Sequence, residues 1–144
     1  MKTSAEVEAW LATIPTDESA DPVWRLQAYR LARFAAARTW PIAGRLRVAP
    51  LGRTVADQLW RSTTAIPSDI AEGFSRSSAP DRLRFFEYAL GSTRESLCWY
   101  AAAHLVLPST QVTSPISELR STRNLLLKMI ASQRARLPRK PAFG

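Results

Sequence analysis

A proline lies inside a run of residues that otherwise has helical periodicity, in the segment Ile66 to Phe74, which reads IPSDIAEGF. Side chains suited to one helical face recur every three or four positions through this part of the chain: Val55, Leu59, Ser62, Ile66 and Ile70. Pro67 has no backbone N–H to donate, and its ring collides with the preceding turn. The sequence therefore predicts a helix over about 54–73 that bends or restarts at Pro67 and ends at Gly73.

The composition favours helices throughout the chain. It has 144 residues, of which 46% are hydrophobic and only five are glycine, and its abundant Ala, Leu and Arg are good helix formers. A chain of this length can bury one core without a second domain. We therefore expect an all-α protein, an up-and-down four-helix bundle with a kinked second helix and a short extra helix at the N-terminus.

Capping residues and prolines set the expected bounds of these helices. Thr3 and Glu6 form a capping-box pattern before the short helix, Pro41 is expected to end the first long helix, and Ser114 and Pro115 to open the last. The expected elements are, in chain order, a short helix over 7–14, an acidic loop over 16–20, a long helix over 22–40, an irregular basic connection over 41–53, and long helices over 54–73, 81–107 and 115–133.

Charge is distributed unevenly along the chain. Lys and Arg total 20 against 12 acids, a net charge of +8. The first 21 residues hold one lysine and five acids, a net −4, so the rest of the chain holds nineteen cations against seven acids, a net +12. We therefore divide the chain into an acidic extension over 1–21, the bundle over 22–133 and a basic tail over 134–144.

A basic body of this kind attracts polyanions, and nucleic acid is the natural class of partner, as RNA or DNA bound without sequence preference. A second interpretation is that the charge serves solubility in a genome rich in Arg codons, since only three of the twenty cations are Lys. The candidate nucleic-acid-binding residues are Arg45, Arg47, Arg53, Arg120, Arg134, Arg136, Arg139 and Lys140.

The third long helix is apolar on two sides. One face carries Leu83, Phe86, Leu90, Leu97, Tyr100 and Leu107, and a second gathers Phe85, Tyr88, Ser92, Trp99 and Val106. A bundle core can use one such face, so the second predicts a subunit interface at Phe85, Tyr88, Ser92 and Trp99. The alternative is that the short N-terminal helix covers it.

Arg123 projects from the middle of the apolar face of the last helix, and an inward arginine needs a carboxylate partner. The second helix offers a polar shoulder of Gln58, Arg61, Asp69 and Glu72, and the third helix offers Glu95. We expect Arg61 and Arg123 to pair with Glu72, Asp69 or Glu95.

Catalytic machinery is not evident in the sequence. The single histidine, His104, falls on the apolar face of the third helix, where a buried, hydrogen-bonded role suits it better than catalysis, and the single cysteine, Cys98, has no evident base. No phosphate-binding glycine loop or metal-ligand spacing is present, so we expect a non-enzymatic protein without metal or cofactor. One cysteine, no signal core and no membrane-spanning run favour the cytoplasm and no membrane partner.

The stretches QLWRSTTAIPSDIAEGFSR and RFFEYALGSTRES resemble a family of bacterial four-helix bundle proteins first noticed as products of 23S rRNA intervening sequences. The family includes the accessory variability determinant of diversity-generating retroelements. Asp69 stands where the family usually has Asn. The matching positions are Gln58, Arg61, Ile66, Pro67, Ser68, Ile70, Ala71, Glu72, Gly73, Arg76, Phe85, Phe86, Gly91, Ser92 and Glu95.

The resemblance implies a bundle assembled as a ring, commonly a homopentamer, whose basic surface in the retroelement member binds nucleic acid and a reverse transcriptase. Two functions then compete. The first is a nucleic-acid-binding oligomer, and the second is an oligomeric adaptor whose partner is a protein. A protein with no retained activity beyond assembly is a third possibility.

Overall fold

The computed structural model describes residues 3–142, which form helices and no strand. The all-α prediction is confirmed. The elements are α1 (Ala5–Leu11), α2 (Thr16–Ser19), the 3-10 helix η1 (Pro22–Arg25), α3 (Gln27–Arg47), α4 (Gly52–Phe74), α5 (Ala79–Ala103) and α6 (Ser109–Ala135).

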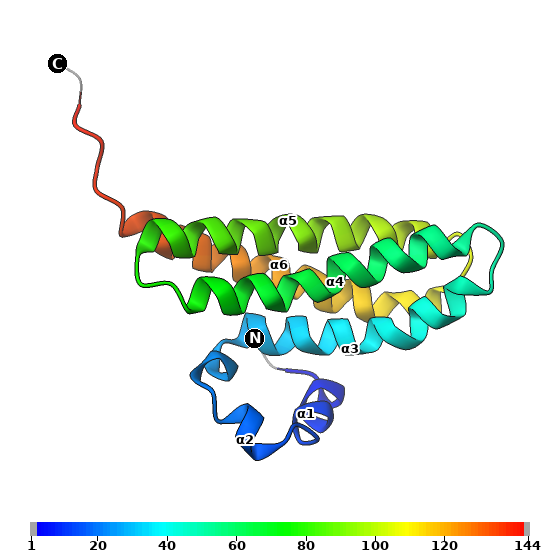
Figure 1. The fold of residues 1–144 in the computed structure, drawn as a ribbon. Coiled ribbons are helices and arrows are strands. Elements are labelled where there is room, and N and C mark those ends of the chain that lie inside the picture. Colours follow the sequence, from blue (N-terminus) through cyan, green and yellow to red (C-terminus); the bar gives the residue numbers. More distant parts are fainter. Residues whose placement is uncertain (1–2, 143–144) are drawn as a thin grey trace.

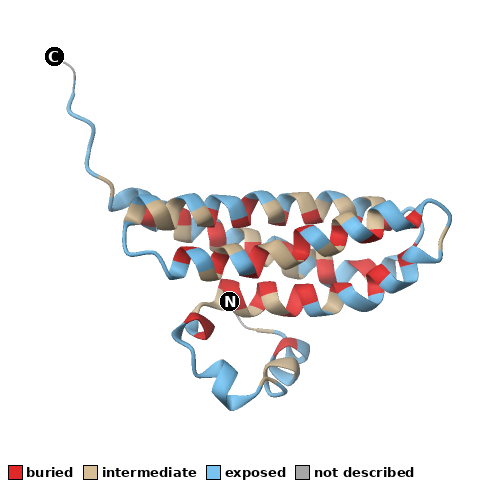
Figure 2. Cartoon of the chain, in the orientation of Figure 1, coloured by how far each residue is buried: buried red, intermediate tan, exposed pale blue. Residues whose placement is uncertain are grey.

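The four long helices, α3 to α6, lie side by side, and each runs opposite to the one before it (Figure 1). Helix α3 packs against α4 and α6, and α5 packs against the same two helices. Buried residues lie mostly on the sides of these helices that face one another (Figure 2, red). The arrangement is that of a helical bundle, and its largest fully buried side chains include Tyr100, Leu46, Leu59, Ile66, Ile70, Leu119 and Leu126.

Three prolines lie inside long helices, and two of them correct the expected bounds. Pro41 does not end α3, which runs on to Arg47, and Pro115 does not open α6, which begins at Ser109. Each proline removes one backbone hydrogen bond, but burial of the same helical face continues beyond it, and this packing keeps the helix intact. Pro67 likewise lies within a continuous α4, so that helix does not restart there.

The connection between α3 and α4 is much shorter than the expected 41–53. It turns within residues 48–51, where Leu51 adopts a left-handed conformation with φ 60°. Gly52 N–H donates to the Ala49 carbonyl at 3.0 Å. A Cβ at position 52 would lie 1.9 Å from the Leu46 carbonyl oxygen, so the close approach of the two helices requires glycine there.

The acidic extension folds onto α3. Ser4, rather than Thr3, caps α1 by accepting a hydrogen bond from the Val7 N–H at 3.3 Å, and the expected loop at 16–20 contains the short helix α2. Val7 packs with Leu31 and Phe34 of α3 in a small second core. Helix α1 therefore lies against α3, on a different side of the bundle from the outer face of α5.

Helix α5 begins as expected, because Ser78 caps it by accepting from the Asp81 N–H at 3.3 Å. It ends at Ala103, and residues 104–107 form a turn in which the Leu107 N–H still donates to the Ala103 carbonyl at 2.8 Å. No helix within residues 3–142 combines the length and apolarity that crossing a membrane requires.

Candidate nucleic-acid interface

In the described part of the chain, seven arginines have a carboxylate within 4.0 Å: Arg33, Arg38, Arg47, Arg61, Arg76, Arg84 and Arg134. Among residues 3–142, the exposed cations without such a partner are Arg25, Arg45, Arg53, Arg94, Arg120, Lys128, Arg136, Arg139 and Lys140. These nine charges are available to an external anion. Most of the residues predicted from sequence to bind nucleic acid are among them.

The predicted cations lie at opposite ends of the bundle. Arg45, Arg47 and Arg53 flank the turn between α3 and α4, whereas the tail leaves α6 at the other end (Figure 1). Helix α6 has 27 residues, so about 40 Å separates its ends, and Arg120 lies between them. One chain therefore does not gather these residues into a single patch.

Two of the predicted cations already have intramolecular partners. Arg47 pairs with Asp57, and Arg134 donates to Glu87 at 2.7 Å. These pairs are more than 40% exposed on both sides, so solvent and salt weaken them, and a phosphate could compete for either arginine.

Arg82 is a half-buried cation that the sequence analysis did not select. Its Nε donates to Gln133 Oε1 at 3.1 Å, and its Nη1 donates to the Arg76 and Ser77 carbonyls at 2.8 and 3.0 Å. All three acceptors are uncharged, and in the described chain no carboxylate lies within ion-pair distance of Arg82. The guanidinium is thus fixed in place with its charge unbalanced. No local signal marks it, because its partners come from two other segments.

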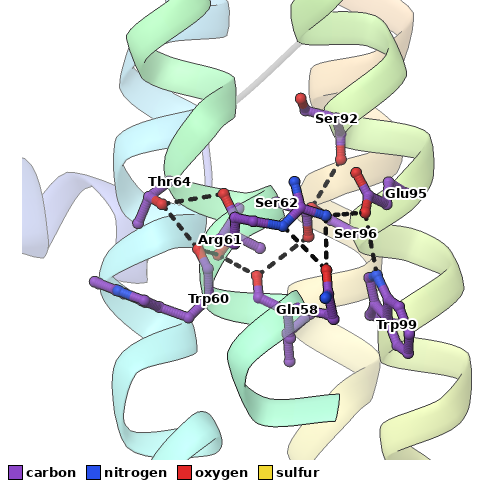
Figure 3. A network of polar contacts seen from close by, with 11 residues as sticks. Gln58, Trp60, Arg61, Ser62, Thr64, Ser92, Glu95, Ser96 and Trp99 are labelled. Carbon is purple, nitrogen blue, oxygen red and sulfur yellow. Dashed lines mark hydrogen bonds and ion pairs between the residues drawn. The ribbon is translucent and has the colours of Figure 1, made fainter. Parts of the chain in front are cut away.

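The polar shoulder of α4 joins α5 through Arg61 and Glu95, which is one of the three pairings expected for Arg61. Arg61 pairs with Glu95 and also donates to Gln58 Oε1 from Nε at 3.0 Å and from Nη2 at 2.7 Å (Figure 3). Trp99 Nε1 donates to the same Glu95 oxygen at 3.4 Å. Beneath this exposed pair, the buried hydroxyls of Ser96 and Ser62 meet at 2.9 Å. The cluster connects the two helices at the surface and in the core.

The expected pairing of Arg123 is wrong. Within residues 3–142, no carboxylate lies within 4.0 Å of it, and Glu72 pairs instead with Arg76 at 2.8 Å. Arg123 is only half-buried, so its long side chain can carry the guanidinium to water while its stem packs.

Asp69, another of the expected partners, forms no ion pair in residues 3–142. Burial, followed by the charge of Glu72, raises the pKa of Asp69 above its ordinary value.

The second face of α5 is open in this chain. Tyr88 is 53% exposed, and Phe85, Ser92 and Trp99 are half-buried. The Arg76 and Arg84 guanidinium groups lie 4.8 and 5.1 Å from the centroid of the Phe85 ring. Because α1 packs on α3, the N-terminal helix does not cover this face, and the interface assigned to it stays a prediction.

His104 is exposed, which corrects the expectation of a buried histidine. It caps the end of α5, beyond the buried stretch, with Nδ1 3.2 Å from the Leu107 carbonyl oxygen. Cys98 is exposed as a free thiol. Among residues 3–142, no group of three or more His, Cys, Asp or Glu side chains is arranged to hold a metal ion.

Comparison with known proteins places the chain in a family. A search of curated proteins found no match. The family model for the 23S rRNA-intervening sequence protein matches residues 25–131, which span α3 to α6 almost completely. The chain therefore belongs to the 23S rRNA-intervening sequence protein family.

Proposed function

We propose that this protein is a non-enzymatic basic four-helix bundle, kinked at Pro67, that assembles into a homopentameric ring and binds RNA or DNA without sequence preference. In this proposal it works in the cytoplasm, as an accessory protein to the reverse transcriptase of a diversity-generating retroelement. The ring and the reverse transcriptase are expectations from the family resemblance.

The observation that carries the nucleic-acid role is the set of nine exposed cations that have no carboxylate partner within residues 3–142. Phosphate contacts need only exposed positive charge. Each chain carries a net +8, so five copies would carry +40. A ring could also align the basic ends of neighbouring bundles, which one chain keeps about 40 Å apart.

The uncovered face of α5 supports assembly. Phe85, Tyr88, Ser92 and Trp99 present an aromatic surface beside the Arg61–Glu95 cluster. Burying such a surface between copies would remove apolar area from water. Light scattering of the purified protein tests this part of the proposal, for which five copies are expected and a monomer is the refuting result.

Titration of labelled RNA and DNA by fluorescence anisotropy at 50 and 200 mM salt tests the binding. If each copy engages three phosphates, affinity should fall roughly 20- to 40-fold between these concentrations, with little dependence on sequence. Absence of binding at 50 mM salt refutes the proposed function. A salt-independent affinity would also contradict it, because the contacts would not be ionic.

A second candidate function is an oligomeric adaptor between proteins, or else a protein encoded by an rRNA intervening sequence that has no direct nucleic-acid role. The pairing of Arg47 with Asp57 and of Arg134 with Glu87 favours this alternative, since each of these two candidate cations must leave a carboxylate before it contacts a phosphate. The position of the gene separates the two candidates. A reverse transcriptase gene and a template repeat beside it would favour the retroelement role, whereas a position inside an rRNA gene would favour the second candidate.

A further inference from the structure

A groove of about 570 Å³ opens at the end of the bundle where α6 finishes, and Arg82 lies in its wall. Two exposed cations line it as well, Lys128 in α6 and Arg136 directly after its end, together with Phe74 and Met129. No carboxylate is among its lining residues. The groove thus combines three positive charges with apolar surface.

Arg82 is prepared for an anion. Its Nε and Nη1 are held by Gln133 and by the two loop carbonyls, while Nη2 has no hydrogen-bond acceptor among residues 3–142, so its two N–H groups are free to donate. The neighbouring acids are engaged elsewhere, because Glu72, Asp81 and Glu87 pair with other arginines. A fixed guanidinium with free donors is a favourable phosphate ligand, because its orientation costs little on binding.

The apolar part of the groove suits a flat ring. Phe74 ends α4 and is 40% exposed, and Met129 packs half-buried beside the core. Aromatic side chains and soft thioethers stack on nucleobases irrespective of base identity. The volume lies within the range of sites that hold small organic ligands.

We infer that this groove holds one unpaired nucleotide of a single-stranded nucleic acid, with its phosphate on Arg82, Lys128 and Arg136 and its base against Phe74 and Met129. This inference rests on the proposed function and adds to it a preference for single strands, since a base paired within a duplex cannot enter the groove.

Anisotropy titrations at 50 mM salt with a labelled single strand and the matching duplex test the inference. Arg82→Gln and Lys128→Gln should each weaken single-strand binding about five-fold or more, because they remove a cation that contacts the phosphate. The matched control is Arg94→Gln. Arg94 is an exposed cation of α5 without a carboxylate partner in residues 3–142, and it lies about 18 Å along the helix from Arg82, outside the groove. Because Arg94 belongs to the nine exposed cations proposed to contact phosphates, its loss measures what any one such charge contributes, and this loss should be clearly smaller than that of either groove variant.

Stacking is tested separately. Phe74→Ala should weaken single-strand binding about five-fold and leave its salt dependence unchanged, because stacking releases no counterions. Leu127→Ala is the control, since Leu127 is 41% exposed, close to the 40% of Phe74, and does not line the groove. Within residues 3–142, Lys128 makes no hydrogen bond with its side chain and no ion pair, so Lys128→Gln keeps the test valid even if Arg82→Gln unfolds.

The outcomes separate the two proposals. Equal losses of affinity in Lys128→Gln and Arg94→Gln would overturn the assignment of a nucleotide to the groove, and so would equal affinity for the single strand and the duplex. Either result leaves non-specific binding in place. Displacement of the single strand by ribose 5-phosphate as effectively as by AMP also overturns it, because the base would then contribute nothing. No binding by the unsubstituted protein refutes the proposed function itself.

Discussion

Glu118 is a carboxylate of α6 that the fold leaves poorly compensated, and Glu118→Gln should stabilise the protein at alkaline pH. Its side chain is only 12% exposed. One oxygen accepts from Arg38 Nη1 at 3.0 Å, whereas the other, Oε2, is buried without a hydrogen-bond partner in the described structure. Burial is the main cause that raises the pKa of Glu118 to about 7, with Arg38 opposing the shift and the charge of Glu6 adding to it.

The sign of the pH effect follows from the direction of this pKa shift. Below the ordinary value of 4.5, the carboxyl is protonated in both the folded and the unfolded chain and contributes no pH dependence. Between 4.5 and about 7 only the unfolded chain releases its proton, so the free energy of unfolding falls by about 1.4 kcal/mol per pH unit. The full cost at pH 8 is about 3 kcal/mol. A cavity of about 250 Å³, which Glu118 and Glu6 line, adjoins the carboxyl, and solvent there screens part of this cost.

Urea unfolding of the wild type and of Glu118→Gln at pH 5 and pH 8 measures this cost. The amide keeps an oxygen for Arg38 and has no charge to bury, so we expect the variant to gain roughly 2 kcal/mol over the wild type at pH 8 and to lose most of that advantage at pH 5. Glu87→Gln, which removes an exposed and paired acid of α5, is the control and should show no gain. A Glu118→Gln variant less stable than the wild type at pH 8 would refute the reasoning, since Arg38 would then depend on the charge.

Two further predictions concern packing and a buried hydrogen bond. A Cβ at Gly73 would lie 2.6 Å from a ring carbon of Phe86, so Gly73→Ala should destabilise the folded protein by about 1–3 kcal/mol in thermal unfolding. A Cβ at Gly91 would have nothing within 4 Å, so Gly91→Ala should stabilise the protein by up to about 1 kcal/mol through the higher helix propensity of alanine. The Tyr100 hydroxyl lies 2.6 Å from Thr39 Oγ1, and both side chains are fully buried. Thr39→Val should lower the free energy of unfolding by about 1–3 kcal/mol, because it leaves the Tyr100 hydroxyl unsatisfied. Adding Tyr100→Phe should recover much of this loss in urea unfolding. Strict additivity of the two changes would contradict the pairing.

The sequence predicted the helical class and much of the helix order because periodicity and caps are local. It failed at Pro41, where the rule that proline ends a helix was given more weight than the apolar spacing that continues through Ile42 and Leu46. Both residues are buried, and their packing outweighs one missing hydrogen bond. The α6 start was misplaced for the same reason, since Val112 is already buried ahead of Pro115.

The candidate site was predictable only where local geometry determines it. Glu95 was one of three carboxylates expected as the partner of Arg61, and the structure pairs these two; the position of each residue on its helix face narrowed the choice without deciding it. Arg82 was missed, because its partner Gln133 lies 51 residues away and is uncharged. Whether Arg123 reaches a carboxylate depends on the rotation of α6 in the bundle, which periodicity fixes too coarsely.

The internal prolines also distribute rigidity among the helices. Pro41, Pro67 and Pro115 each interrupt the backbone hydrogen-bond ladder of α3, α4 or α6, whereas the only proline of α5, Pro80, lies in its first turn, where no ladder bond is lost. Helix α5 is thus the long helix that can least open in part, and local fluctuations should begin in the other three. Its outer face is therefore already ordered before any partner arrives, and binding there loses little conformational entropy.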